Sequence, residues 1–304
     1  MRYDIIVVGA GPAGLTCAVY ARRAGKSVLV IEKNAFGGQM TFSPKIENFP
    51  GEKSISGNAL ADKMVTQVLD LGADVESAQV NSVKQKDGVV TVETDVGSFE
   101  GSSLVIAAGA RHRTLGIAGE EDLVGRGVYF CAVCDGAFFA GKDVALVGGG
   151  NSALQEALLL SETCRKVTIV QNLPFLTGEK LLCDAVEAKD NIEIILGYVA
   201  DSFALDGGKM KALVAVNEKG EKVSVECEGV FVAIGLVPDN SCFENLVALD
   251  ERGYIKAGED TKTSNEAVFA AGDCRTKAIR QVTTACADGS VAALAACRYV
   301  DSLR

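Results

Sequence analysis

The chain has 304 residues, of which 48% are hydrophobic and 23% charged, so it is long enough for two globular domains with separate cores. Its formal net charge of -10 disfavours binding to nucleic acid and to anionic membranes, and no run of Lys and Arg provides a local basic patch. No apolar run approaches the roughly 18 residues of a membrane span, and the N-terminal segment lacks a basic leader. We therefore expect a cytoplasmic protein that binds neither nucleic acid nor membrane.

Two stretches repeat one pattern: a buried strand, a glycine turn, a helix and a second buried strand. They are residues 3–33 and 141–172, and each predicts a βαβ unit of the dinucleotide-binding type. Between them, residues 89–110 are typical of paired strands that end in a small-residue turn. Further strand-like segments and a final small-residue helix follow at residues 211–217, 222–239, 267–274 and 283–300.

Turn residues interrupt the apolar runs near Arg113 and near Pro238, and these positions are the predicted domain boundaries. The sequence thus predicts an α/β fold of two dinucleotide-binding domains, both Rossmann-like and three-layered. Residues 114–238 form the second domain, which is inserted into the first, residues 1–113 and 239–304.

The first glycine turn has the context of a nucleotide site. Gly9, Gly11 and Gly14 follow a strand and open a helix, and Glu32 ends the next strand. Gly9 permits the tight turn, Gly11 lets the backbone approach a pyrophosphate, and Gly14 lets helix and strand pack closely. The helix N-terminus offers N–H groups to the anion, and Glu32 would accept hydrogen bonds from ribose hydroxyls. The alternative is a glycine turn beside an ordinary surface glutamate.

Only two of the ten cysteines form a close pair, Cys131 and Cys134; the other eight stand singly, most of them in apolar segments typical of buried residues. The two-residue spacing favours a dithiol that cycles to a disulfide. Zinc needs about four ligands, no second such pair exists, and His112 is the only histidine, so we expect no metal site. Two unconnected core cysteines remain an alternative. His112 itself is predicted to be a packing or surface residue.

The second glycine turn, glycines 148–150 with Ala153, also predicts a helix start, but the strand that follows ends without charge. Proteins that bind NADH usually read the ribose with an acidic residue at that strand end. Gln171 and Asn172 stand there instead, and they can donate or accept hydrogen bonds but supply no charge. A structural turn that holds no nucleotide is therefore the favoured interpretation.

Five short motifs occur in the order found in the low-molecular-weight thioredoxin reductases, and the chain resembles that family over essentially its whole length. The resemblance implies an FAD-binding domain made of residues 1–113 and 239–304. It also implies an inserted domain of the pyridine-nucleotide type with the cysteine pair, thioredoxin as substrate, and a homodimer. The motifs are GAGPAGL (9–15), GGQ (37–39), IENFPG (46–51), CAVCDG (131–136) and AAGDC (270–274).

The same resemblance implies which residues hold FAD. The pyrophosphate would lie at Gly11, Pro12 and Ala13, the adenine at the backbone of Val80, and the ribityl chain at Asp273. Gln39 and Asn48 would approach the flavin, and Arg280, Gln281 and Val282 would lie beside its ring, where a helix beginning in this segment would stabilise negative charge. The other residues expected to line the cofactor are Gly9, Gly14, Glu32, Lys33, Gly38, Gly109 and Gly272.

Three residues are assigned to the reaction by resemblance. Cys134 would exchange electrons with the flavin, and Cys131 would attack the disulfide of the substrate protein. Asp135 matches the acid/base residue of the family, since a carboxyl group in a partly buried cleft can have its pKa raised. The alternative for Asp135 is a turn or helix-capping residue.

The resemblance departs from the NADPH-dependent members at the second glycine turn. Those members carry a His-Arg-Arg segment and a later arginine, which bind the 2′-phosphate. Here Gln171, Asn172 and Leu173 occupy the segment and Thr177 the later position. The chain is most similar to the ferredoxin-dependent flavin thioredoxin reductases, which implies reduced ferredoxin as the electron donor.

Two other functions are consistent with the sequence. One is a thioredoxin reductase that uses NADH or NADPH through an atypical site, and the other is a non-catalytic flavin-binding interaction protein. A ferredoxin is normally acidic, so docking would need local positive charge. Lys45 and Lys53 are candidates for it, and ordinary solvated lysines are the alternative.

Overall fold

The computed structural model describes residues 2–303. The chain forms two compact units, one reaching to residue 111 and resuming at residue 237, the other comprising residues 112–236. The sequence-based boundaries fall two residues later in each case. The difference arises where the chain passes between the units, because β7 (Ala110–His112) and β16 (Leu236–Pro238) pair there in a two-stranded sheet.

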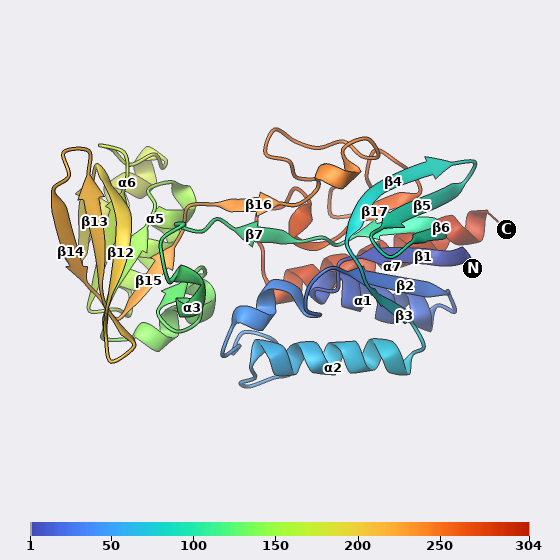
Figure 1. The fold of residues 1–304 in the computed structure, drawn as a ribbon, viewed down its shortest axis with the longest axis horizontal. Helices are drawn as coiled ribbons and strands as arrows, with labels where there is room; N and C mark the ends of the chain where they lie inside the picture. Colours follow the sequence, from blue (N-terminus) through green and yellow to red (C-terminus); the bar gives the residue numbers. More distant parts are fainter. Residues whose placement is uncertain (1, 304) are drawn as a thin grey trace. The chain divides into compact units, whose positions relative to one another are not determined.

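The first unit is assembled from both ends of the chain, so blue and red segments occur together within it in Figure 1. Its helices and strands up to the crossing are β1 (Arg2–Val8), α1 (Pro12–Arg23), β2 (Val28–Glu32), the 3-10 helix η1 (Gly38–Phe42), α2 (Gly57–Asp70), β3 (Asp74–Ser77), β4 (Val80–Lys86), β5 (Val89–Thr94) and β6 (Ser98–Ile106). Those after it are η3 (Ser241–Phe243), β17 (Val268–Ala270), η4 (Gly272–Cys274) and α7 (Val282–Ser302).

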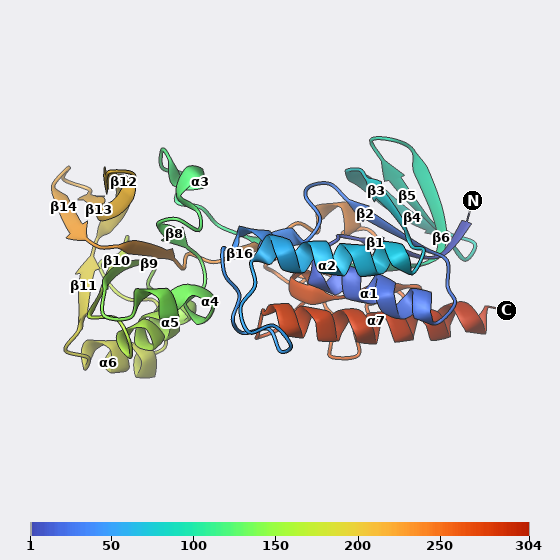
Figure 2. The same ribbon diagram turned by 90° about the horizontal axis from the view of Figure 1, so that it is seen from below.

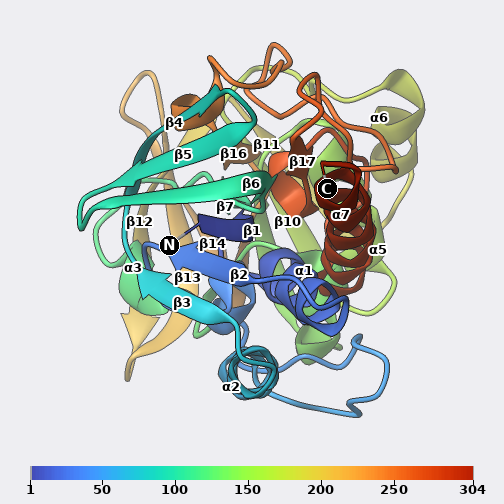
Figure 3. The same cartoon turned by 90° about the vertical axis from the view of Figure 1, so that its right-hand side faces the viewer.

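The sheet of this unit has the strand order β3-β2-β1-β6-β5-β4, with β17 also paired to β6. Strands β1, β2, β3, β6 and β17 run parallel, whereas β4 and β5 pair antiparallel. Ile5 and Val7 of β1 face a core shared with α1 and α7, and Ile6 faces the core on the opposite side. Helices α1 and α7 lie side by side (Figure 3). A Cβ on Gly289 of α7 would come within 2.2 Å of the Ala13 carbonyl oxygen, so this close helix contact requires glycine.

The second unit repeats the plan on a smaller scale. Its helices and strands are α3 (Glu120–Leu123), β8 (Val128–Tyr129), α4 (Ala132–Asp135), η2 (Gly136–Phe139), β9 (Asp143–Val147), α5 (Asn151–Ser161), β10 (Lys166–Gln171), α6 (Lys180–Glu187), β11 (Ile192–Leu196), β12 (Tyr198–Asp206), β13 (Lys209–Asn217), β14 (Lys222–Glu226) and β15 (Gly229–Val232).

A parallel sheet of order β11-β10-β9-β15-β8 forms the middle layer of this unit. Helices α5 and α6 cover one face, and the antiparallel sheet β12-β13-β14 covers the other (Figure 2). Leu146 of β9 packs in the core on the helix side, and Ala145 packs in the core under the antiparallel sheet. The predicted α/β class with two Rossmann-like domains is therefore confirmed. Within residues 2–303, no helix is long and apolar enough to cross a membrane.

Candidate active site

Cys131 and Cys134 form a disulfide, with Cα atoms 5.3 Å apart. Cys131 lies just before α4, its sulfur accepts a hydrogen bond from the Cys134 backbone N–H at 3.2 Å, and its carbonyl accepts from the Asp135 N–H at 3.0 Å. Both cysteines are partly exposed, whereas Asp135 is buried. The short helical turn therefore brings the two sulfurs together in a partly exposed position, and a buried aspartate follows directly in the chain.

A second carboxyl group faces this turn from α5. Glu156 Oε2 lies 3.4 Å from the backbone N of Ala132, between the two cysteines in sequence. Burial raises the pKa of Glu156 to about 7, the Ala132 N–H opposes this rise, and the nearby Asp135 carboxyl adds to it. The pKa of the Tyr129 phenol is also raised, first by burial and then by Asp135. Sequence reasoning missed Glu156, because nothing in its position after the second glycine turn distinguishes it from a surface helix residue.

His112 packs against the residue that precedes the cysteine pair. Its ring stacks on Phe130, with centroids 4.8 Å apart and planes inclined by 21°. Burial lowers the pKa of His112 to about 4, so the imidazole is neutral at pH 7. This geometry matches the predicted packing role.

The first glycine turn is held by the strand that follows it. Gly9 N–H donates to the Ile31 carbonyl at 2.8 Å, and Ala10 N–H donates to Glu32 Oε2 at 2.8 Å. The other oxygen of Glu32 accepts from Asn34 N–H at 2.9 Å. A Cβ on Gly14 would meet the Gly9 carbonyl oxygen at 1.8 Å, so helix and turn approach as closely as the sequence predicts. The expected ribose-binding glutamate therefore also fixes the turn itself.

A second glycine backbone lies beside the N-terminus of α1. Gly38 has φ +60°, and a Cβ there would come within 3.2 Å of Gly11 Cα, while Gly11 precedes α1 with no side-chain cap and Pro12 is its first residue. Two glycine backbones thus lie close together at a helix N-terminus, whose free N–H groups can bind an anion such as a pyrophosphate. Ala13 lies buried within the first turn of α1. Gln39 follows on η1, which begins at Gly38.

Asp273 lies at the C-terminal edge of the same sheet, on η4 after β17. Its Oδ1 is buried and has no hydrogen-bond partner among the residues described here. Burial raises the pKa of Asp273, although the positive charges of Lys277 and Arg280 act against that rise. A buried acceptor of this kind fits a ligand that brings hydroxyl groups, as the ribityl chain of FAD does.

The segment beside Asp273 orders its polar side chains through local contacts. The Arg280 guanidinium lies 4.5 Å from the centre of the Tyr254 ring, and Asn48 Nδ2 donates to Gln281 Oε1 at 3.2 Å. Gln281 caps α7, which begins at Val282. The structure thus brings Asn48, 233 residues away in sequence, to the segment predicted to lie beside the flavin ring.

The remaining predicted cofactor residues have ordinary contacts. Lys33 forms an exposed ion pair with Asp239 at 2.5 Å, and the carbonyl of the buried Val80 accepts from the Gln79 amide at 2.9 Å. Gly109 and Gly272 adopt positive φ, +70° and +79°. All lie in the first unit, and their contact with a cofactor stays a prediction.

One buried ionic cluster has no signal in the sequence. Asp288 of α7 accepts from the fully buried Arg275 at 2.8 and 2.9 Å, from Lys277 at 2.8 Å and from Gly272 N–H at 2.9 Å. The cluster ties the loop of Asp273 to the final helix. No spacing rule predicts it, because the donors and the carboxylate meet only when η4 and α7 pack together.

The second glycine turn keeps the backbone bonds of the first and differs in its side chains. Gly148 N–H donates to the Val170 carbonyl at 3.0 Å, as Gly9 does to Ile31. Thr177 N–H donates to the Gly149 carbonyl at 2.8 Å, which repeats a 2.8 Å bond from Gly37 to Ala10 in the first turn.

Gln171 takes the place that Glu32 has in the first unit. It is 5% exposed, and its Nε2 donates to the Phe175 carbonyl at 3.4 Å. A Cβ on Gly149 would come within 2.5 Å of Gln171 Cδ, so the carboxamide packs against the turn. Leu173 and Phe175 are exposed on the segment beyond it. The strand end that would read a ribose thus carries a neutral, buried side chain.

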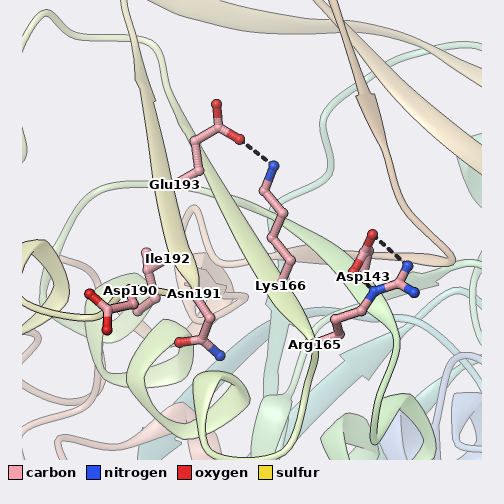
Figure 4. A pocket seen from close by; sticks show the side chains of 7 residues that line it. All are labelled: Asp143, Arg165, Lys166, Asp190, Asn191, Ile192 and Glu193. Carbon is pink, nitrogen blue, oxygen red and sulfur yellow. Dashed lines mark hydrogen bonds and ion pairs between the residues drawn. The ribbon is translucent and has the colours of Figure 1, made fainter.

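A hollow of about 360 Å³ lies elsewhere in this unit, at the N-terminal ends of β9, β10 and β11 (Figure 4). Four of its five charged side chains form ion pairs within it, Arg165 with Asp143 and Lys166 with Glu193. Ligands of open α/β sheets bind at the opposite, carboxyl ends of the strands. We therefore do not assign a site to this hollow. Over residues 2–303, no three His, Cys, Asp or Glu side chains are grouped so that they could hold a metal ion.

Known proteins match nearly the whole length of this chain. Residues 3–289 match the family described as pyridine nucleotide-disulphide oxidoreductase. The chain is 39% identical over 303 residues to a thioredoxin reductase of Listeria monocytogenes, covering 99% of this chain and 95% of that protein. It is 38% identical over 303 residues to the thioredoxin reductase of Bacillus subtilis, covering 99% and 96%.

Two further relatives are informative. The crystal structure of thioredoxin reductase from Streptococcus pyogenes superposes with a TM-score of 0.94 at 37% identity, covering 99% of both chains. A 34.2 kDa protein in the rubredoxin operon of Clostridium pasteurianum is 39% identical over 300 residues, covering 98% of this chain and 97% of that protein. The chain belongs to the pyridine nucleotide-disulphide oxidoreductase family, as a homologue of the low-molecular-weight thioredoxin reductases.

Proposed function

We propose that this protein is a cytoplasmic, homodimeric, FAD-dependent thioredoxin reductase that takes its electrons from reduced ferredoxin. The observation that carries the donor assignment is the second glycine turn, where the buried, neutral Gln171 packs against Gly149. The disulfide between Cys131 and Cys134 carries the reductase assignment.

The residues of the first unit fit FAD. The N-terminus of α1 at Gly11 would receive the pyrophosphate, and the buried Oδ1 of Asp273 would accept hydrogen bonds from the ribityl hydroxyls. Bound FAD supplies the ability to accept electrons singly and to deliver them as a pair. Positive charge at Arg280 and the N-terminus of α7 would favour its reduced, anionic form.

The cysteine pair would carry electrons to the substrate. Cys134 receives them at the cofactor side, Cys131 attacks the disulfide of thioredoxin, and Asp135 holds and releases the proton. The buried position of Asp135 beside the pair supports that role. A thiolate is the attacking species in such an exchange, so proton control at this turn sets its rate.

Ferredoxin as the donor is supported by what the second unit lacks. An NADPH site grips the 2′-phosphate with guanidinium groups, and each such bond is worth about 1.5–3 kcal/mol. Asn172, Leu173 and Thr177 supply no positive charge at these positions. The relative described as a protein in a rubredoxin operon is consistent with an iron protein as the donor.

The second candidate is a reductase that uses NADH or NADPH through backbone contacts. The intact backbone of the second turn favours it, in particular the Gly148 bond to Val170. One anaerobic experiment separates the two: NADPH, NADH and reduced ferredoxin are added in turn while the flavin absorbance is followed, and then oxidised thioredoxin is added.

Bleaching by reduced ferredoxin alone, followed by reduction of thioredoxin, is the expected result. Rapid bleaching by micromolar NADPH or NADH would overturn the ferredoxin assignment. A Cys134→Ser variant should still accept electrons from the donor but fail to reduce thioredoxin, and retained thioredoxin reduction would refute the relay. Bleaching by no donor would favour the non-catalytic flavin-binding interaction protein.

A further inference from the structure

Glu156 is a titratable side chain that faces the cysteine turn and has no part in the function proposed above. It projects from α5, within the same compact unit as the pair, and its Oε2 reaches the backbone N of Ala132 at 3.4 Å. Neither the sequence motifs nor the disulfide geometry requires a carboxyl group there.

The surroundings of Glu156 are poor in compensating charge. The groups that act on its carboxyl are the Ala132 N–H and the carboxyl of Asp135, both from the α4 turn. The Asp135 carboxyl also raises the pKa of the Tyr129 phenol, which lies on β8, after the larger effect of burial. No cation appears among these contacts, so burial favours the protonated form and keeps the pKa of Glu156 near 7, where cellular pH can change its charge.

We propose that Glu156 is a positioning residue of the redox pair: it holds the cysteine turn through Ala132, and its charge controls the acidity of the dithiol formed there. The proposal rests on the proposed disulfide chemistry but not on the identity of the electron donor. Reduction of the disulfide adds negative charge close to a carboxylate, and the two charges repel each other.

Because of this repulsion, reduction of the disulfide is coupled to proton uptake by Glu156. The Cys131–Cys134 disulfide and ionised Glu156 take up two electrons, from the donor that serves the pair, and two protons. The S–S bond breaks, one sulfur becomes a thiol, the other remains a thiolate, and the second proton is held by Glu156. The carboxyl group therefore takes up a proton as the attacking thiolate is formed, and returns it when the disulfide closes again.

Glu156→Gln tests this with little structural change, because the amide oxygen can still accept from Ala132 N–H while the charge is lost. The purified protein is reduced with dithiothreitol, freed of reductant, and alkylated with iodoacetamide from pH 5 to 9. Peptide mass spectrometry then gives separate rates for Cys131 and Cys134 among the ten cysteines. We expect the variant's more reactive cysteine to be alkylated up to about twofold faster at pH 7, where half of Glu156 is ionised, and by a larger factor at pH 8. Its rate profile should also lose a step near pH 7.

Two variants serve as controls. Glu162→Gln removes the same charge at the exposed end of α5, where Glu162 pairs with Lys189, and should leave the profile unchanged. Glu156→Asp keeps the charge and should retain the wild-type step. Profiles of Glu156→Gln and wild type that superimpose would overturn the proposal, as would a Glu156→Asp profile that shifts as far as that of Glu156→Gln. Failure of the ferredoxin assay would leave this measurement intact, since dithiothreitol replaces the donor and the flavin absorbance is not read.

Discussion

The carboxamide of Gln171 lies against the backbone of Gly149, in the place that a carboxylate occupies in the first unit. A Cβ on Gly149 would stand 2.5 Å from Gln171 Cδ, whereas Glu32 accepts a hydrogen bond from Ala10 at the corresponding turn. The same fold therefore appears twice in one chain, once with a charged strand end and once with a neutral one. Its second copy is where the donor assignment is most directly tested.

Restoring positive charge to that strand end should create affinity for NADPH. In an Asn172→Arg/Leu173→Arg/Thr177→Arg variant we expect NADPH to bind at least about tenfold more tightly, since one charge-assisted bond of about 1.5 kcal/mol suffices. NADH should gain much less, because it has no 2′-phosphate. Isothermal titration calorimetry measures both, with the corresponding triple glutamine variant as control. Equal gains for NADH and NADPH would contradict the charge argument.

Removing the buried carboxylate at residue 273 should release FAD. Asp273→Ala is expected to purify with a clearly lower flavin-to-protein absorbance ratio and a higher Kd for added FAD, because it loses the acceptor meant for the ribityl chain. Asp70→Asn, at the exposed end of α2, is the control. Full FAD content in Asp273→Ala would show that the carboxylate faces no cofactor.

In the FAD-free protein, the buried Asp273 carboxyl group should make the free energy of unfolding depend on pH. Its pKa is raised in the folded state, so the folded form binds more protons than the unfolded form above the usual value of 3.8. The free energy of unfolding should therefore fall as pH rises through the raised pKa, and Asp273→Asn should remove that loss. Urea titrations of both apo proteins between pH 4 and 8 measure the difference, and parallel pH curves would contradict it.

His112 should give a pH dependence of the opposite sign. Its pKa falls from 6.5 to about 4 on folding, so the unfolded chain binds the extra proton and stability is lost as pH drops from about 6.5 towards 4. The full effect is at most about 3 kcal/mol. His112→Phe keeps an aromatic ring against Phe130 and cannot titrate, so the difference between its urea-unfolding curves and those of wild type isolates the histidine. A difference that is constant with pH would exclude a buried neutral imidazole.

Removal of only one partner of the buried Arg275–Asp288 ion pair should strongly lower the free energy of unfolding. Asp288→Ala leaves a fully buried guanidinium without its main partner and should lower the free energy of unfolding by about 3–5 kcal/mol. Arg275→Met/Lys277→Met/Asp288→Leu removes all three buried charges of the cluster and should cost much less. Chemical denaturation of wild type and both variants gives the comparison, and equal losses in the single and triple variants would mean that packing rather than charge sets the cost.

Local patterns predicted the two βαβ units, because strand, turn and helix signals lie within some thirty residues of each other. The roles of Gly9 and Gly14 followed from the tightness of the turn, and close contacts confirm that tightness. Contacts between distant segments could not be predicted in this way. Asn48 meets Gln281, and Arg275 meets Asp288, only because separate elements pack together.

Neutral residues at the end of β10 were visible in the sequence, but their packing was not. The amino-acid sequence alone does not show that Gln171 is buried or that Thr177 is hydrogen-bonded to Gly149. Glu156 is a similar case, since its importance depends on the turn it faces rather than on its own neighbours. Sequence patterns thus located the cysteine pair and the two glycine turns, whereas three-dimensional packing revealed Glu156 beside the pair and the burial of Gln171.

The pairing of β7 with β16 has a consequence for how such a protein can change. The chain leaves the first unit and returns to it on adjacent strands, so residues 112–236 can be exchanged as a single cassette with two neighbouring joints. The cysteine pair, its carboxyl neighbours and the altered second turn all travel within that cassette. A lineage that replaced it would acquire a new electron donor and a newly tuned disulfide in one genetic event, while the remaining segments kept their residues unchanged.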